Sequence, residues 1–202
     1  MPTAKGYLLA NGQGSSGQVL ISQGPGVLPV WSSTLTGAAS CGSFYDTAQQ
    51  PLVSATASQL VTINTSDLVG AGITLVAGSK VTVSGAGIYN LQFSAQLQNA
   101  DNASIRNATV WIRKNFVTGT GNDSQFDIPY SAGQVSVPNK HGNVNGHLIA
   151  AWNLFLSLAA NDYVQFWWSG ESTDLSLETS PAGTTPTTPA SAAMIVTMTQ
   201  VR

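Results

Sequence analysis

The sequence contains very little charge. Seven Lys or Arg and nine Asp or Glu residues make 8% of its 202 residues charged, against about 25% in an ordinary soluble domain. A net charge of -2 and a pI near 5.4 leave no basic footprint, which argues against DNA or RNA as the main partner. The surface must consist mostly of small polar, amide and apolar groups. We expect part of it to be covered by copies of the chain or by a neighbouring protein.

Cysteine and long apolar runs are also scarce. Cys41 is the single cysteine, so no internal disulfide can form. No stretch approaches the roughly 20 apolar residues that span a bilayer. Residues 1–10 lead into only a brief apolar run, so we expect no secretory signal peptide. These features exclude a transmembrane helix and a cystine scaffold, and the length suits one all-β domain or one domain plus an arm.

Groups that perform catalysis are few. The two histidines, His141 and His147, stand in a Gly- and Asn-rich stretch without metal-ligand spacing, and no Gly-x-Ser-x-Gly elbow is present. Glu171, Asp174 and Glu178 could offer ligands to a calcium ion, although acids spread over a polar loop are more often solvated. The sequence predicts no enzyme, no cofactor and no metal site.

Residues 1–41 differ in texture from the rest. A glycine-rich stretch (11–18) precedes a short apolar run, and turn-forming Gly and Pro (23–26) precede a second run. Because Gly permits positive φ and Pro fixes φ, this pattern predicts strand, turn and extended strand. A flexible linker should lack such apolar residues, so between a disordered linker and a docked arm we favour the arm. Its expected contact residues are Val19, Leu20, Ile21, Val30 and Trp31.

From residue 42 onward, period-two alternation recurs between turn signals, which predicts an antiparallel double sheet of eight to ten strands. The clearest strand is 88–98, in which Tyr89, Leu91 and Phe93 should face inward between amide side chains. Two longer connections, 125–146 and 178–190, are the expected variable loops. The other expected strands are 43–47, 59–64, 73–76, 80–84, 109–114, 148–158, 163–169 and 193–201.

Two strands carry aromatics that alternation does not explain. Residues 163–168 are aromatic on both faces, so either a loop covers the outer face or Trp167 or Trp168 packs in a subunit interface, which we favour. Trp111 and Arg113 should both point outward. They either form a cation-π pair or contact a neighbouring subunit, or Arg113 merely protects an edge strand by its charge.

Four motifs together suggest a family. Residues 42–47, 85–94, 152–158 and 161–164 resemble a tumour-necrosis-factor-like (complement globular head) jelly roll of the kind found in virion proteins of tailed bacteriophages. Residues 17–31 are similar to a short element of phage tail-fibre and capsid-decoration proteins. The resemblance covers residues 42–202 and implies a homotrimer, here without a collagen-like stalk. The predicted organisation is an extended N-terminal arm (1–41) and a jelly-roll trimerisation domain (42–202).

This resemblance predicts a structural protein made in the host cytoplasm and carried on the outer surface of the virion. Its partners would be itself, as a homotrimer, and the major capsid protein, which it would decorate or cement. The expected trimer residues are Tyr89, Trp152, Phe166 and Trp168. The alternative is a tail-fibre tip or receptor-binding module that recognises a host-surface glycan or protein through Trp111, Arg113, Trp167 and the two long loops.

Overall fold

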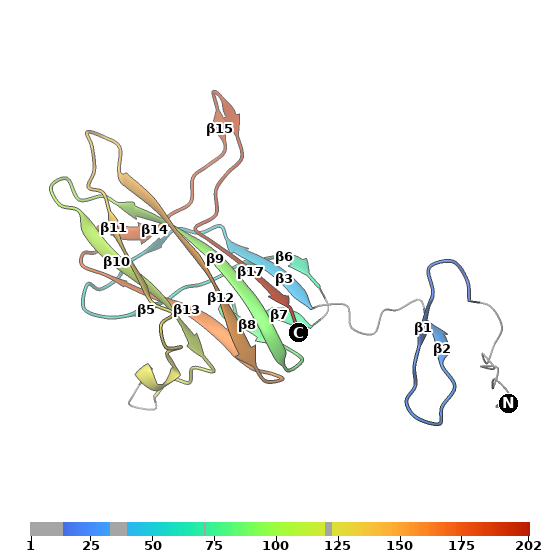
Figure 1. Ribbon diagram of the computed structural model, residues 1–202. Coiled ribbons are helices and arrows are strands. Elements are labelled where there is room, and N and C mark those ends of the chain that lie inside the picture. Colours follow the sequence, from blue (N-terminus) through green and yellow to red (C-terminus); the bar gives the residue numbers. More distant parts are fainter. Residues whose placement is uncertain (1–13, 33–39, 71, 120–122) are drawn as a thin grey trace, which may run out of the picture. The chain divides into compact units, whose positions relative to one another are not determined.

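The computed structural model describes residues 14–32, 40–70, 72–119 and 123–202 (Figure 1). The chain divides into two units, residues 1–38 and 39–202. Within the described ranges the secondary structure is β throughout, apart from one short 3-10 helix, η1 (Asp123–Phe126). The all-β class predicted from the alternation is therefore confirmed.

In the first unit, β1 (Val19–Ile21) and β2 (Val30–Ser32) pair antiparallel as a hairpin. The predicted strand, turn and strand are present, but they fold back on each other instead of forming one extended segment. Gly14 lies against the Trp31 ring, where an added Cβ would come within 2.5 Å of the indole. Val19, Leu20 and Val30 are more than one third exposed, so the hairpin keeps much of its apolar surface accessible.

The second unit is a jelly-roll-like double sheet in which every strand pair is antiparallel. The first sheet contains, in order, β11 (Gly133–Val137), β10 (Arg106–Lys114), β13 (Tyr163–Gly170), β8 (Lys80–Val83) and β7 (Ile73–Val76), with β5 (Gln59–Leu60) also on β13. The second contains β12 (Gly146–Leu158), β9 (Gly87–Asn99), β14 (Leu175–Leu177), β17 (Met194–Gln200), β4 (Gln50–Pro51), β3 (Cys41–Asp46) and β6 (Thr65–Val69).

The core lies between the two sheets and follows from the alternation. On β9, Tyr89, Leu91 and Phe93 are buried as predicted. The Phe93 ring meets Phe166 of β13 at 5.0 Å between centroids, which joins the sheets face to face. Packing of these inner faces removes the aromatic surface from water and is the main stabilising term of the fold.

Three expected trimer residues belong to this core. Tyr89, Phe166 and Trp168 are fully buried within one chain, so their side chains present no surface to another copy. Period-two alternation identifies the inner face of a strand, but it does not say whether an apolar face meets the chain's own second sheet or a neighbour. For these three residues the expected assignment to an interface is corrected to the core.

The expected strand 59–64 is shorter as a regular strand, because only Gln59–Leu60 pair in a sheet. Backbone bonding continues beyond it: the Val61 N–H donates to the Phe166 carbonyl and the Ile63 N–H to the Gly78 carbonyl. The Gln50 amide satisfies the backbone of Thr62: its Nε2 donates to the Thr62 carbonyl at 2.9 Å, and its Oε1 accepts from the Thr62 N–H at 2.9 Å. A side chain thus takes the place of a second neighbouring strand at Thr62.

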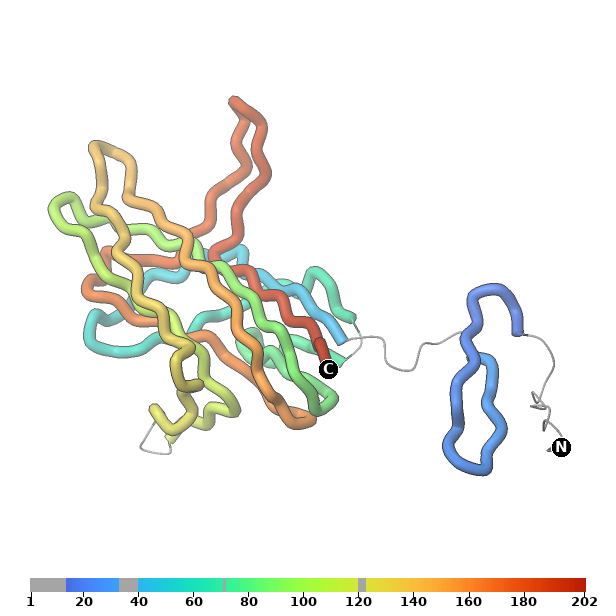
Figure 2. The backbone as a smooth tube through the Cα atoms, in the orientation of Figure 1, coloured from blue at the N-terminus to red at the C-terminus, as the bar shows by residue number. Residues whose placement is uncertain are grey.

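Two turns shape the ends of the second unit. Asp162 closes the turn after β12, because its Oδ2 accepts from the Ala159 N–H at 2.8 Å and its own N–H donates to the Ala159 carbonyl, as the Asn-Asp pair predicted. At another edge, β15 (Gly183–Thr184) and β16 (Thr187–Thr188) form a small exposed hairpin. Figure 2 shows it projecting from the body of the double sheet.

Candidate functional site

The outer face of the second sheet carries no Lys, Arg, Asp or Glu side chain on β12, β9, β17 and β3. We call this surface the uncharged face. It comprises the side chains that alternate with the core residues on β12, β9, β17 and β3. Its members are Cys41, Ser43, Tyr45, Ile88, Asn90, Gln92, Ser94, Gln96, Gln98, His147, Ile149, Ala151, Asn153, Phe155, Ser157, Ile195, Thr197 and Thr199.

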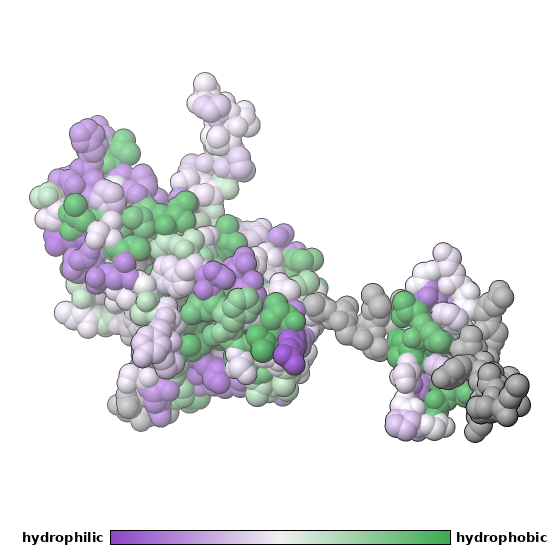
Figure 3. Space-filling model, viewed as in Figure 1, coloured by the Kyte–Doolittle hydropathy of each residue, from purple (hydrophilic) through white to green (hydrophobic). Residues whose placement is uncertain are grey.

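Large apolar groups on the uncharged face lie open to solvent. Ile149 and Phe155 are 67% and 65% exposed, and Ile195 is 43% exposed. In the view of Figure 3, hydrophobic residues form several separate green areas on the larger unit. A depletion of charge combined with exposed aromatic and aliphatic groups is typical of the centre of a protein interface.

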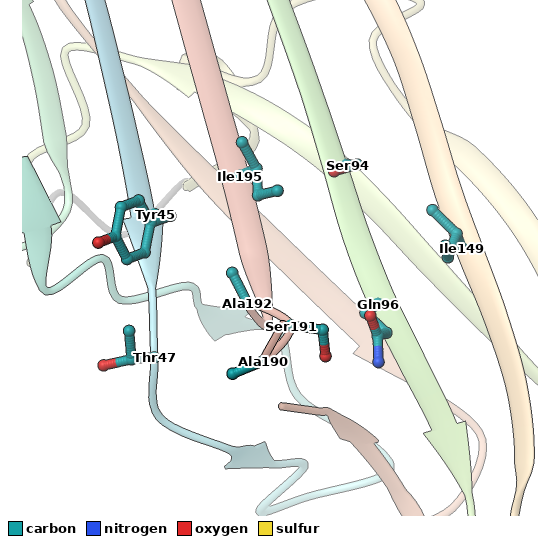
Figure 4. A pocket seen from close by; sticks show the side chains of 9 residues that line it. All are labelled: Tyr45, Thr47, Ser94, Gln96, Ile149, Ala190, Ser191, Ala192 and Ile195. Atoms are coloured by element: carbon teal, nitrogen blue, oxygen red, sulfur yellow. The ribbon is translucent and has the colours of Figure 1, made fainter. Parts of the chain in front are cut away.

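A groove marks one end of the uncharged face. It has a volume of about 490 Å³, and Tyr45, Ser94, Ile149 and Ile195 line it from four neighbouring strands. Figure 4 shows these side chains spread across the sheet, with residues 190–192 at the start of β17 closing one side. The floor is apolar and the rim carries hydroxyl and amide groups, so a side chain of another protein could be held there without an ion pair.

The uncharged face ends at an unprotected edge strand. β12 is 13 residues long and contains no Lys, Arg, Asp, Glu or Pro. In the described part of the chain its one ladder is with β9. Exposed edge strands are normally blunted by charge, proline or a covering segment, since they otherwise pair with other chains. The edge of β12 therefore favours coverage by a second protein chain.

His147 of β12 contacts Glu178 at the same end of the face as the groove, where Gln96 both lines the groove and reaches Glu178. His147 Nδ1 lies 2.5 Å from Glu178 Oε1, and Gln96 Nε2 also reaches this carboxylate at 3.4 Å. The Glu178 side chain is 5% exposed and that of His147 is 49% exposed. The sequence predicted a histidine in water or with one hydrogen bond and a solvated glutamate; the fold gives His147 one hydrogen-bond contact and buries its partner Glu178.

Trp152, the fourth expected trimer residue, faces the other way. It lies on the inner side of β12, partly buried, with its ring 4.6 Å from that of Phe93. The outer phase of β12 mixes apolar with polar residues, and its two large apolar members, Ile149 and Phe155, were missed as surface residues. The sequence signal that could have identified them is that apolar residues occur at both odd and even positions of 146–158.

The expected ligand surface is only partly open. Trp111, Arg113 and Trp167 point to the outer side of the first sheet, as predicted, but Arg113 and Trp167 are buried. The segment after β10 covers them: the Phe116 ring lies 4.9 Å from Trp167, and the Arg113 guanidinium stacks 4.2 Å from the same indole. The segment that follows β10 thus covers the outer side of β13, which explains why this strand carries aromatic residues on both of its faces. Trp111 alone of the three stays partly accessible.

The expected arm residues lie in the first unit. Val19, Leu20 and Ile21 stand on β1 and pair with Ser32, Trp31 and Val30 of β2. The hairpin thus gathers all five residues into one small element. No statement about their partner follows from the pairing alone.

The acidic residues do not form a cluster. Glu171 accepts hydrogen bonds from Asn107, Asp174 from Ser172, and Glu178 interacts with His147. Among residues 14–32, 40–70, 72–119 and 123–202, no group of three or more His, Cys, Asp or Glu is arranged to hold a metal ion. In the same ranges no helix is long and apolar enough to cross a membrane.

The fold and the uncharged face define a class: an all-β, jelly-roll-like chain with a broad outer face free of Lys, Arg, Asp and Glu. No protein-family model matches the sequence, and no curated protein is similar enough to count as a relative. The likeness to phage virion proteins therefore remains a prediction from the sequence motifs.

Proposed function

We propose that this chain is a non-enzymatic structural protein of a tailed-phage virion, a homotrimer that decorates and cements the capsid. The observation that carries the proposal is the uncharged face, with Ile149, Phe155 and Ile195 exposed on it. The virion context rests on the sequence resemblance. In this proposal three copies pack through their uncharged faces, and each N-terminal hairpin contacts the major capsid protein.

The size of the uncharged face suits an interface between copies. At about 3.3 Å per residue and about 4.8 Å between strands, its four strands cover roughly 600 Å². A standard interface covers about 800 Å² on each partner, so the face together with its edge strand supplies most of what is needed. The apolar groups at its centre lose their contact with water on assembly, which favours association.

The hairpin supports attachment to a shell. Leu20 and Val30 are about 40% exposed, and an isolated two-stranded hairpin gains little stability of its own. Three such hairpins on one trimer would bind adjacent shell subunits together, and multivalency makes modest single contacts strong.

The test is the number and position of copies in a virion density map. Decoration predicts many copies spread over the capsid surface, and shells that become sensitive to heat when the protein is missing. A receptor-binding tip, the alternative from the sequence, predicts few copies at the tail and a changed host range on deletion. Copies confined to the tail would overturn the capsid assignment.

A further inference from the structure

A second groove lies on the outer side of the first sheet, whereas the uncharged face belongs to the second sheet. It has a volume of about 400 Å³ and runs over β10, β11 and β13 beside the loop 55–58. Sites for small molecules have volumes of about 300–1,000 Å³. The groove is therefore large enough for a small ligand.

Strand register aligns unused hydrogen-bonding groups along the floor of this groove. Thr109 of β10 stands directly opposite Gln134 of β11 on one side and Ser169 of β13 on the other. None of these three side chains hydrogen-bonds to another residue in the described part of the chain. Each hydroxyl donates one hydrogen bond and accepts others, and the amide can do both. The floor is a row of free, uncharged donors and acceptors.

Trp111 forms an aromatic wall that is held in place. Its Nε1–H donates to Asp127 Oδ1 at 3.0 Å, and the same oxygen accepts from Arg113 Nε at 2.7 Å. The buried Arg113 guanidinium lies 5.7 Å from the Trp111 ring. Because these contacts fix the indole before a ligand arrives, stacking on it requires little further ordering.

Glu171 closes the other end as a fixed carboxylate. The Asn107 N–H and Nδ2–H donate to its two oxygens at 3.0 and 2.9 Å. These hydrogen bonds hold the pKa of Glu171 below its usual value, so the group is ionised at neutral pH. An ionised carboxylate accepts hydrogen bonds from hydroxyl groups and repels acidic ligands.

We propose that this groove binds a neutral saccharide, with one pyranose ring stacked on Trp111 and its hydroxyls bonded to Gln134, Thr109, Ser169 and Glu171. A pyranose combines an apolar C–H face with a rim of hydroxyls that both donate and accept. The groove offers the complementary set: one aromatic face, three uncharged polar groups and one carboxylate. This inference is independent of the trimer and of the capsid, since its residues lie on the other sheet.

The experiment screens the full chain against an array of neutral and acidic oligosaccharides and then titrates the best neutral oligosaccharide by calorimetry. Trp111→Ala should weaken binding about tenfold or more, since it removes the stacking surface. Gln134→Ala should weaken it about fivefold through one lost hydrogen bond. Trp111→Phe, which keeps a ring, should lose less affinity than Trp111→Ala.

Tyr130→Ala is the matched control, because Tyr130 is fully exposed and does not line the groove. It should bind like the unmodified chain, and circular dichroism should show that all variants are folded. Absence of binding to every neutral oligosaccharide, a preference for acidic ones, or equal binding by folded Trp111→Ala would overturn the proposal. A failure of trimer formation would leave this result unaffected.

Discussion

Arg113 illustrates how a charge becomes part of the interior in this chain. Its guanidinium lies 4.2 Å from the centre of the Trp167 ring and 5.0 Å from that of Phe116, and its Nε contacts Asp127 Oδ1 at 2.7 Å. The stem and the planar head both pack against aromatic surface, and the carboxylate neutralises the charge. Alternation predicted the outward direction of this side chain correctly. It could not predict the covering segment, which comes from residues beyond the strand.

Asp162 provides a test at a single residue. Burial opposes its ionisation, but hydrogen bonds from Asn115 and Ala159 and the Lys114 charge together lower its pKa. Asp162→Ala should destabilise the fold by about 1–3 kcal/mol at pH 7, because the donors lose a charged acceptor. The stabilisation by a carboxylate with a depressed pKa is present above its unfolded pKa of about 3.9 and is lost as the pH falls through the folded pKa.

The measurement is denaturant unfolding of both proteins at pH 7 and near pH 3. The difference between them should shrink at the lower pH, because below the unfolded pKa of about 3.9 the stabilisation by the ionised carboxylate begins to be lost. Lys140→Ala, which alters a cation outside this turn, serves as the control. A difference that stays constant with pH would show that Asp162 acts by packing rather than by charge.

Asp46 acts in the opposite direction with pH. It is 1% exposed, and burial raises its pKa although the Gln50 amide donates to Oδ2. A raised pKa means that the folded state favours the protonated form. The contribution of Asp46 to the free energy of unfolding is therefore greatest below the unfolded pKa and is lost as the pH rises through the folded pKa. As the pH falls, the stability gained through Asp46 thus partly offsets the stability lost through Asp162.

At the scale of elements, β9 and β12 differ in how far the sequence determines them. On β9 one phase is apolar and the other is amide or hydroxyl, so its core face could be predicted residue by residue. On β12 one phase is apolar throughout and the other mixes apolar with polar residues, so the pattern indicates the core face but not the apolar residues left exposed on the other face. Trp152, expected in a trimer interface, lies inside, whereas Phe155 lies outside.

The uncharged face can be tested by placing charge at its centre. The double variant Ile149→Lys/Phe155→Lys should fold, because both side chains are about two thirds exposed in one chain. It should weaken association between copies at least about hundredfold, since an unpaired buried charge costs about 3–5 kcal/mol. Sedimentation velocity across a concentration series measures the change.

Val76→Lys is the matched control, because Val76 is 46% exposed on β7, the edge of the other sheet. It should assemble like the unmodified chain. If the double variant also assembled normally, the uncharged face would have no part in the contact between copies.

At the scale of the whole molecule, the two units have separate tasks in this account. Residues 39–202 contain the double sheet and its core, so they should fold without the first unit. Removing residues 1–38 should leave cooperative unfolding and trimer formation unchanged, whereas binding to purified phage shells should be lost. Co-sedimentation with shells measures the binding. Retained binding would assign attachment to the double sheet instead of the hairpin.

The scarcity of charge, 16 Lys, Arg, Asp and Glu residues in 202, follows in the proposed trimer from the contact of copies with one another. The most direct test is the mass of the purified protein by light scattering at micromolar concentration and neutral pH. The account predicts a particle of three times 20.9 kDa. A stable, soluble particle of the single-chain mass would contradict it.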